Sequence, residues 1–235
     1  MRLGIFILHY NTEVMTRELA SGIEGTIVVD NGSNKAFEME GREVLRLDRN
    51  YGFTVGWNKA IEHYFDRFDA FWLMNSDILI SKEAIARIRA VAATEIGIIT
   101  PAFNCWMWHC RNLLSYQYQY YGNGLRSVPV VEFTAPVIHK AVFEKVGLFS
   151  KEFPRGWGVD FDFCYRTMKA GFRIVVDDLS NFYHIGQQTI EMTEGKSSYN
   201  QKANSEWILG MNILWGSNWQ KNLFGDKDFI KNIKN

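Results

Sequence analysis

The 235-residue chain carries no net charge, because Lys plus Arg and Asp plus Glu each number 26. Without an overall basic field it is not expected to attract nucleic acid or anionic lipid, so any anion must be bound locally. No apolar run approaches the ~20 residues that a membrane span needs, and the first residues lack the order of a signal peptide. Three cysteines, an odd number, do not indicate a disulfide framework. These absences predict a cytoplasmic protein with no transmembrane segment.

Several common signatures are also missing. Cys105 and Cys110 flank His109, but the spacing matches no usual zinc pattern and no fourth ligand is evident, so buried or idle thiols are the better interpretation. Neither a P-loop nor the dinucleotide-binding fingerprint occurs. There are no repeats or low-complexity segments, and 47% of the residues are hydrophobic, which is ample for a sizeable core. The chain therefore suits one large domain, or a domain with a small appendage.

Short β-rich runs alternate with helical patterns over the first hundred residues. Strands are expected at Leu3–Leu8, Thr26–Val29, Arg42–Leu47, Asp69–Met74 and Ile96–Thr100. Helices are expected at Glu13–Ser21, Gly56–Phe65 and Lys82–Thr94, the last capped by Ser81. This alternation predicts an α/β fold with a mostly parallel sheet flanked by helices, in which residues 1–100 form a nucleotide-binding half.

The pattern changes after residue 100. Residues 101–129 are rich in Trp, Tyr, Gln and Asn without a sustained period, which is typical of long loops or an irregular hairpin. The elements expected after them are an extended run at Val130–Ile138, helices at Ala141–Val146 and Asp160–Ala170, and strands at Arg173–Val176 and Asn181–His184. Residues 101–190 would form an acceptor-binding and catalytic half, completing a domain over 1–190. Residues 191–235, with three tryptophans, predict a small helical C-terminal appendage.

Asp77 is the most informative residue. It follows the buried run Phe71–Met74, and ligands of such sheets collect at the carboxyl ends of the strands. Carboxylate oxygens suit Mg²⁺ and Mn²⁺, which commonly complete their coordination shells with water and phosphate. The alternative, that Asp77 caps the next helix, is weaker because Ser81 is the better cap. We therefore interpret Asp77 as a metal ligand.

Asp30 ends a second parallel strand at the same expected edge. It precedes Asn31-Gly32-Ser33, a turn-forming sequence, so it either stabilises the turn or accepts hydrogen bonds from a nucleobase or ribose. Both interpretations stay open. A further loop bracketed by Asn50, Gly52 and Asn58 enters a helix, whose amino end favours phosphate.

Asp160 and Asp162 begin a helix directly after a Gly156-Trp157-Gly158 loop. Acidic residues at a helix start are often only caps, but two carboxylates two residues apart point in different directions. One can then face a cleft as a general base, while the other supports the helix or binds a substrate hydroxyl. His184 ends the last expected strand and can complete a metal shell begun by Asp77, although a lone His is more often structural.

Four segments and one histidine occur in a characteristic order. The segments read VVDNGS (Val28–Ser33), NYGFTVGWN (Asn50–Asn58), NSD (Asn75–Asp77) and VDFDFCYR (Val159–Arg166), and His184 follows them. Together they resemble the inverting glycosyltransferases of family 2, in particular rhamnosyltransferase-like members, which have the GT-A fold. The resemblance covers about residues 3–190. Asn75 replaces the first Asp of the family's metal motif, and Val159 replaces the Glu that usually precedes the base, which makes Asp160 the base by register.

The resemblance implies transfer of a sugar from a nucleoside-diphosphate sugar to a hydroxyl of a carbohydrate acceptor, with inversion. UDP or dTDP is the expected nucleotide, and Mn²⁺ or Mg²⁺ is the expected cofactor, bound by Asp77 and His184. Asp160 would be the general base, and Trp157 and Asp162 would contact the acceptor. The nucleotide-binding residues implied are Tyr10, Asn11, Asp30, Asn50, Gly52, Asn58, Asn75 and Ser76. Acceptor binding would extend to residues 106–121 and the Trp-rich tail.

Two rival functions have different requirements. A non-catalytic carbohydrate or nucleotide-sugar binding protein would not need both a metal site and a base. A sugar-1-phosphate nucleotidyltransferase would need a Gly-rich loop after the first strand, where this chain has His9-Tyr10-Asn11-Thr12. The aromatic stretches are alternatively a homodimer contact.

Overall fold

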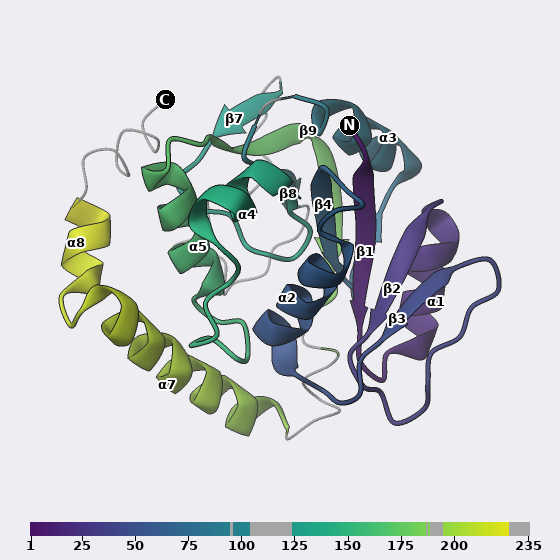
Figure 1. Ribbon diagram of the computed structural model, residues 1–235, viewed down its shortest axis with the longest axis horizontal. Coiled ribbons are helices and arrows are strands. Elements are labelled where there is room, and N and C mark those ends of the chain that lie inside the picture. Colours follow the sequence, from purple (N-terminus) through teal and green to yellow (C-terminus); the bar gives the residue numbers. More distant parts are fainter. Residues whose placement is uncertain (95, 104–123, 187, 189–194, 226–235) are drawn as a thin grey trace.

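A computed structural model of the chain describes residues 1–94, 96–103, 124–186, 188 and 195–225. In these ranges the strands form one nine-stranded sheet (Figure 1). The strands are β1 (Leu3–His9), β2 (Thr26–Asp30), β3 (Glu43–Arg46), β4 (Ala70–Asn75), β5 (Ile78–Ile80), β6 (Ile98–Phe103), β7 (Leu125–Ser127), β8 (Val137–His139) and β9 (Ile174–His184). Their order across the sheet is β3-β2-β1-β4-β8-β6-β9-β5, and β7 pairs with β9.

Most of the strands point the same way. β1, β2, β3 and β4 pair in parallel, β8 is antiparallel to both β4 and β6, and β9 is parallel to β6. Six strands therefore share one direction, whereas β5, β7 and β8 run against them. The predicted α/β class with a mostly parallel sheet is confirmed.

Helices cover both faces of this sheet. On one face α2 (Gly52–Tyr64), α4 (Lys140–Val146) and α5 (Val159–Lys169) pack against strand residues such as Phe6, Val29 and Leu73. On the other face α1 (Glu13–Gly22) and α3 (Lys82–Val91) pack against Ile7 and Met74. Successive strand residues point to opposite faces, so two cores form on one set of strands. A sheet buried on both sides explains why β4 reads as a continuous apolar run.

Strand register brings three strand ends together. His9 pairs with Asp30 across β1 and β2, and Leu8 pairs with Asn75 across β1 and β4. The segments that follow these strands thus leave the same edge of the sheet. This edge lies at the lower end of β1 in Figure 1.

Four expected elements differ from the structure. The predicted strands Arg173–Val176 and Asn181–His184 are one strand, β9, whose pairing with β6 shifts register between Pro101 and Ala102. The extended run at 130–138 is a strand only at Val137–His139. The helix expected from Gly56 begins at Gly52. Ser81 caps α3 as predicted, since its side chain accepts a hydrogen bond from the Ala84 N–H.

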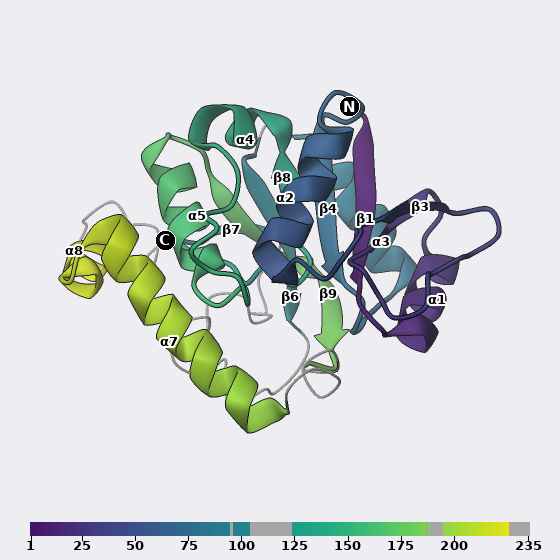
Figure 2. The same ribbon diagram turned by 60° about the horizontal axis from the view of Figure 1, so that its bottom comes forward.

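The C-terminal helices α7 (Lys196–Trp215) and α8 (Trp219–Gly225) lie along the side of the molecule that carries α5 (Figures 1 and 2). Trp207 stacks on Phe161 with ring centroids 5.5 Å apart, and Met211 and Trp219 are buried in the same core as α5. In the part of the chain described, no helix is long and apolar enough to cross a membrane.

Candidate functional site

Asp77 and His184 meet at the carboxyl edge of the sheet. Asp77 follows the end of β4, and His184 ends β9, whose pairing with β5 places Ile78 opposite His184. The Ile185 N–H donates to the Asp77 carbonyl, which fixes the two segments side by side. The imidazole Nε2 lies 3.2 Å from Asp77 Oδ1, and both side chains are largely buried. The structure therefore brings together the two residues that the sequence predicts as metal ligands.

The electrostatics of this pair suit a hard cation. Burial by itself would lower the pKa of His184, but the hydrogen bond and the charge of Asp77, with the charge of Glu132, outweigh burial and raise it. One carboxylate and one imidazole are ligands that Mn²⁺ accepts. Within the described ranges no group of three or more His, Cys, Asp or Glu side chains is arranged to hold a metal. The described residues thus fit a cation that takes two protein ligands and fills its remaining positions with water and phosphate oxygens.

Asp160 lies in the first turn of α5 and is buried. Its Oδ1 accepts a hydrogen bond from the Phe161 N–H. Burial, followed by the nearby charge of Glu132, raises the pKa of Asp160 to about 7. A carboxyl group with this pKa can take up a proton near neutral pH, which is what a general base requires.

Asp162 has a different environment on the same helix. It is 1% exposed, and its Oδ2 accepts hydrogen bonds from Ser150 Oγ at 2.7 Å and from the Arg166 guanidinium at 2.7 Å. Its Oδ1 accepts from Trp215 Nε1 at 3.0 Å. The two carboxylates therefore point to different partners, as predicted. Asp162 is engaged by protein groups, so the structure shows its helix-supporting role, and acceptor binding by Asp162 stays a prediction.

Glu132 is a residue that sequence reasoning missed. It lies between β7 and β8, where the Thr134 carbonyl accepts from the Asn75 N–H and the Val131 carbonyl accepts from Cys164 Sγ. This segment thus runs between the end of β4 and helix α5. The charge of Glu132 acts on both Asp160 and His184. Its only sequence signal was a single acidic residue in an otherwise apolar run.

Asp30 is the last residue of β2 and is fully buried. Its oxygens accept hydrogen bonds from the Ser33 and Phe37 N–H groups at 2.9 Å, and Arg46 forms an ion pair with it. Burial alone would raise the pKa of Asp30, but these donors outweigh burial and lower it. The structure shows the turn-stabilising alternative directly. Hydrogen bonding of Asp30 to a nucleotide stays a prediction.

The start of α2 contacts the backbone at Pro154. The Phe53 N–H donates to the Pro154 carbonyl at 3.0 Å, and a Cβ on Gly52, whose φ is +73°, would collide with the same carbonyl. Asn50 Oδ1 accepts from the Gly52 N–H and from Asn31 Nδ2. These contacts hold the start of α2 in place, and phosphate binding there stays a prediction.

Asn58 serves a similar structural purpose. Its amide makes two hydrogen bonds with the backbone of Phe149, accepting from the N–H at 3.1 Å and donating to the carbonyl at 2.8 Å. Asn58 thereby ties α2 to the segment that leads into the Gly-Trp-Gly loop. The nucleotide-binding roles of Asn50, Gly52 and Asn58 stay predictions.

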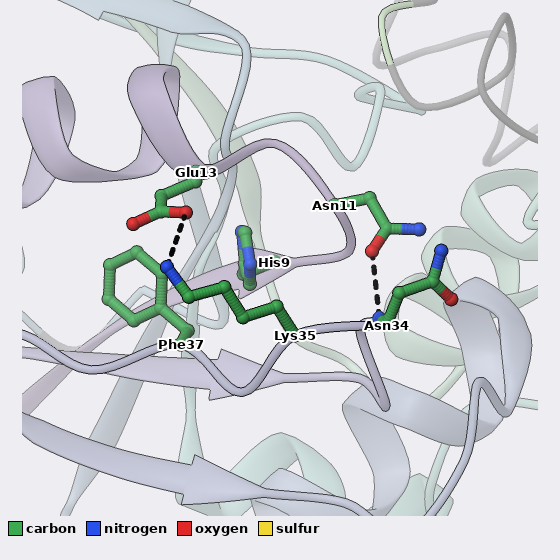
Figure 3. Close-up of a pocket in the computed structure, with 6 residues that line it drawn as sticks. All are labelled: His9, Asn11, Glu13, Asn34, Lys35 and Phe37. Atoms are coloured by element: carbon green, nitrogen blue, oxygen red, sulfur yellow. Dashed lines mark hydrogen bonds and ion pairs between the residues drawn. The ribbon is translucent and has the colours of Figure 1, made fainter.

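A pocket of about 370 Å³ opens beside the ends of β1 and β2 (Figure 3). Asn11 has a φ of +56°, which Asn tolerates, and its N–H donates to Ser33 Oγ while its Oδ1 accepts from the Asn34 N–H. The loops after the two strands are thus hydrogen-bonded to each other. The residues that line the pocket are His9, Asn11, Glu13, Asn34, Lys35 and Phe37. Two nucleotide ligands are predicted directly after β1. Asn11 lines the pocket, whereas Tyr10 is partly buried and does not line it.

Comparison with solved structures decides the fold. GalNAc-T7, crystallised with UDP, GalNAc and Mn²⁺, matches 94% of this chain and 49% of its own with a TM-score of 0.69 and 11% identity. The mannosyltransferase PcManGT from Pyrobaculum calidifontis, in complex with GDP-Man and Mn²⁺, matches 94% of this chain and 73% of its own, with a TM-score of 0.58 and 12% identity. S. aureus TarS 1–349 matches 99% of this chain and 81% of its own, with a TM-score of 0.56 and 14% identity. The fold is of the GT-A type.

Comparison of sequences covers a smaller part of the chain than comparison of structures. The uncharacterized proteins Rv1525 of Mycobacterium tuberculosis and Mb1552 of Mycobacterium bovis are each 32% identical over 93 residues, which cover 39% of this chain and 36% of theirs. No protein-family model matches the chain.

On this GT-A fold the loop at 153–158 lies next to the predicted base. Gly156 and Gly158 have φ values of +87° and +91°, and Trp157 between them is partly buried. The aromatic stretch 106–121, predicted to bind the acceptor, lies outside the described residues, as do Cys105, His109 and Cys110. The third cysteine, Cys164, is buried.

Proposed function

We propose that this chain is a metal-dependent inverting glycosyltransferase, which moves a sugar from a nucleoside-diphosphate donor to a hydroxyl of a carbohydrate acceptor. The observation that carries the proposal is the joint presence of the Asp77–His184 pair and the buried Asp160, both under the charge of Glu132. Solved structures with this fold hold Mn²⁺ together with UDP or with GDP-Man. A cation site and a base within one electrostatic neighbourhood are what such a transfer requires.

Each residue has a role in this proposal. Asp77 and His184 hold the cation, and Asn75 in place of an acidic residue predicts modest metal affinity without donor. When bound, the cation neutralises charge on the leaving diphosphate. Asp160 accepts the proton of the acceptor hydroxyl as that oxygen attacks, and its raised pKa makes it basic enough for this step. Trp157 covers the apolar face of a sugar ring and helps to exclude water.

The nucleoside lies at the pocket of Figure 3, beside the β1 and β2 ends. Uracil and thymine present one N–H between two carbonyls, which suits side-chain amides such as those of Asn11 and Asn34. UDP or dTDP is therefore the nucleotide we propose. The pocket lies beside the ends of β1 and β2, and the loop with Asp77 follows the neighbouring end of β4. Their position at one edge of the sheet supports a single ligand that contacts both.

Binding of nucleotides tests this proposal. Purified chain is titrated with UDP, dTDP, GDP and their common sugar conjugates, with Mn²⁺ or with EDTA, and the shift in melting temperature is measured. A true donor raises the melting temperature by mass action, and more so with Mn²⁺. Asp77→Ala should abolish the additional effect of Mn²⁺. A chain that no nucleoside diphosphate stabilises in either condition would contradict the proposal.

Asp160→Asn separates this function from a non-catalytic nucleotide-sugar binding protein. A binding protein gains nothing from a buried carboxyl group whose pKa lies near 7, because burying an unpaired acid costs stability. The variant should bind donor as the wild type does and lose transfer.

A further inference from the structure

Four buried side chains form a hydrogen-bonded chain between the pocket and the Asp77 loop. Thr12 Oγ1 lies 2.9 Å from Ser76 Oγ, 3.2 Å from His9 Nδ1 and 3.3 Å from Thr16 Oγ1. Thr16 Oγ1 also lies 2.8 Å from His9 Nδ1. All four residues are at most 4% exposed. The chain joins the end of β1, the start of α1 and the end of β4.

Thr12 is the centre of this chain. A hydroxyl has one proton and two lone pairs, so three partners saturate it. Thr12 precedes α1, and its carbonyl accepts from the Thr16 N–H, which fixes its backbone as well. Loss of the Thr12 hydroxyl would remove a hydrogen-bond partner from the buried hydroxyl of Ser76.

The two ends of the chain lie at two different parts of the site. His9 lines the pocket of Figure 3 and packs against Phe37 with ring centroids 4.7 Å apart. Ser76 directly precedes Asp77, whose carbonyl is held from the other side by the Ile185 N–H. The turn that carries Asp77 is therefore held by β9 on one side and by Thr12 on the other.

We propose that Thr12 is a positioning residue, which couples nucleoside binding at the pocket to the placement of Asp77 for the cation. The inference rests on the proposed function. A nucleoside that contacts the β1 and β2 loops then fixes His9 and Thr12, and through Ser76 it fixes the carboxylate that holds the metal. The coupling is reciprocal, so Mn²⁺ also strengthens nucleoside binding through the same hydroxyls.

Thr12→Val tests this role because it removes the hydroxyl and keeps the shape. The affinity for UDP is measured by calorimetry with Mn²⁺ and with EDTA, and the ratio of the two is the Mn²⁺ enhancement. We expect Thr12→Val to lower this enhancement about three- to tenfold, the worth of one buried hydrogen bond. Affinity in EDTA should stay within about twofold of the wild type, since no contact to the nucleotide is removed.

Two further variants act as controls. Thr12→Ser keeps the hydroxyl and should retain the enhancement. Thr26→Val removes a buried hydroxyl that donates to the Ile23 carbonyl at the opposite end of β2, and it should match the wild type in the enhancement. If Thr12→Val fails to fold, Ser76→Ala breaks the chain at its other end and should lower the enhancement likewise.

The outcomes separate the inference from the function on which it rests. A Thr12→Val variant that is less stable but keeps the full Mn²⁺ enhancement overturns the inference. The hydrogen bonds of Thr12 would then have a structural role alone. Equal losses of affinity with Mn²⁺ and with EDTA overturn it as well. A wild-type chain that binds none of UDP, dTDP and GDP in either condition overturns the proposed function, and the inference with it.

Discussion

Asp160 and Asp162 stand two residues apart on one helix, and their partners give them opposite properties. Asp162 accepts from Arg166, Ser150 and Trp215, whereas Asp160 is buried and accepts only from backbone N–H groups. Residues two apart on a helix do not face each other, so one can be fixed by protein while the other stays available for a ligand. Burial then raises the pKa of Asp160 to about 7, which makes its carboxylate a stronger base.

Asp160→Asn should change the pH dependence of stability. The pKa of Asp160 rises from 3.8 to about 7 on folding, so its contribution to stability is complete below pH 3.8 and is lost as the pH rises through 7. The Asn side chain does not titrate, so above pH 7 the free energy of unfolding of the variant should exceed that of the wild type by about 2 to 4 kcal/mol. Urea unfolding at pH 5 and pH 8 measures this difference. Asp162→Asn is the matched control and should lose stability, because it weakens the ion pair with Arg166.

Asp30→Ala should lower the free energy of unfolding by about 2 to 4 kcal/mol, because buried N–H donors and Arg46 lose their acceptor. Asp69→Ala is its control, since Asp69 forms a pair with Arg2 in which both side chains are well exposed. Chemical denaturation of both variants measures the contrast. Equal stabilities of Asp30→Ala and the wild type would refute a structural role for Asp30 in its turn.

At the scale of elements, the loop at 153–158 is held between α2 and α7. On the α2 side, Thr54 Oγ1 donates to the Phe153 carbonyl, and the Phe53 N–H donates to Pro154. On the α7 side, Tyr199 donates its hydroxyl to the Arg155 carbonyl, and Glu206 pairs with the Arg155 guanidinium. The loop that carries Trp157 is thus fixed by helices at opposite ends of the sequence.

Gly158→Ala should show how tightly α7 closes on this loop. Gly158 and Gly171 share a φ of +91°, but a Cβ on Gly158 would collide with the Trp207 ring, whereas one on Gly171 would meet no atom within 4 Å. Both substitutions incur the left-handed backbone cost of about 1 to 2 kcal/mol. Gly158→Ala should cost at least about 1 kcal/mol more, because it also displaces Trp207. Thermal unfolding of the two variants gives the comparison. Equal losses of stability would show that Trp207 of α7 moves aside at no cost in free energy.

Sequence periodicity was sufficient for the alternating elements of the first hundred residues, whereas the pairing of Asp77 with His184 was predicted from their residue types and from the order of the motifs. Periodicity could not place the start of α2, because the Phe53 N–H finds its acceptor in Pro154, about a hundred residues away. Asp162 depends likewise on Trp215, a contact 53 residues away. The Thr12–Ser76 hydrogen bond joins residues 64 apart, and nothing local in either segment marks it. Local pattern therefore predicted the strands and their ends, and long-range contacts decided which side chains remain available.

At the scale of the whole molecule, α7 shares a core with the sheet. Met211, Trp219 and Leu223, from the segment expected as a C-terminal appendage, belong to the same buried cluster as Phe161 of α5. Removal of α7 would expose Phe161 and deprive Asp162 of the Trp215 donor. The part of the chain that carries α5 and the C-terminal helices should accordingly behave as one unit.

The chain should therefore unfold in a single cooperative transition. Calorimetry should give equal calorimetric and van't Hoff enthalpies, and circular dichroism and tryptophan fluorescence should report the same melting temperature. Two separated transitions, with the fluorescence change preceding the loss of helix signal, would show instead that α7 and α8 form an independent appendage.

Hydrolysis of a bound sugar nucleotide, in which the sugar passes to water and the nucleoside diphosphate is released, is the sharpest test of Asp160 as the general base. The wild type, Asp160→Asn and Asp162→Asn are compared with the sugar nucleotide that stabilises the chain best, in the presence of Mn²⁺. We expect Asp160→Asn to bind this donor with an unchanged Kd and to release nucleoside diphosphate ~10² to 10⁴-fold more slowly than the wild type, the usual worth of a general base. Asp162→Asn should lose less activity and more stability. Equal release by Asp160→Asn and the wild type would contradict the account.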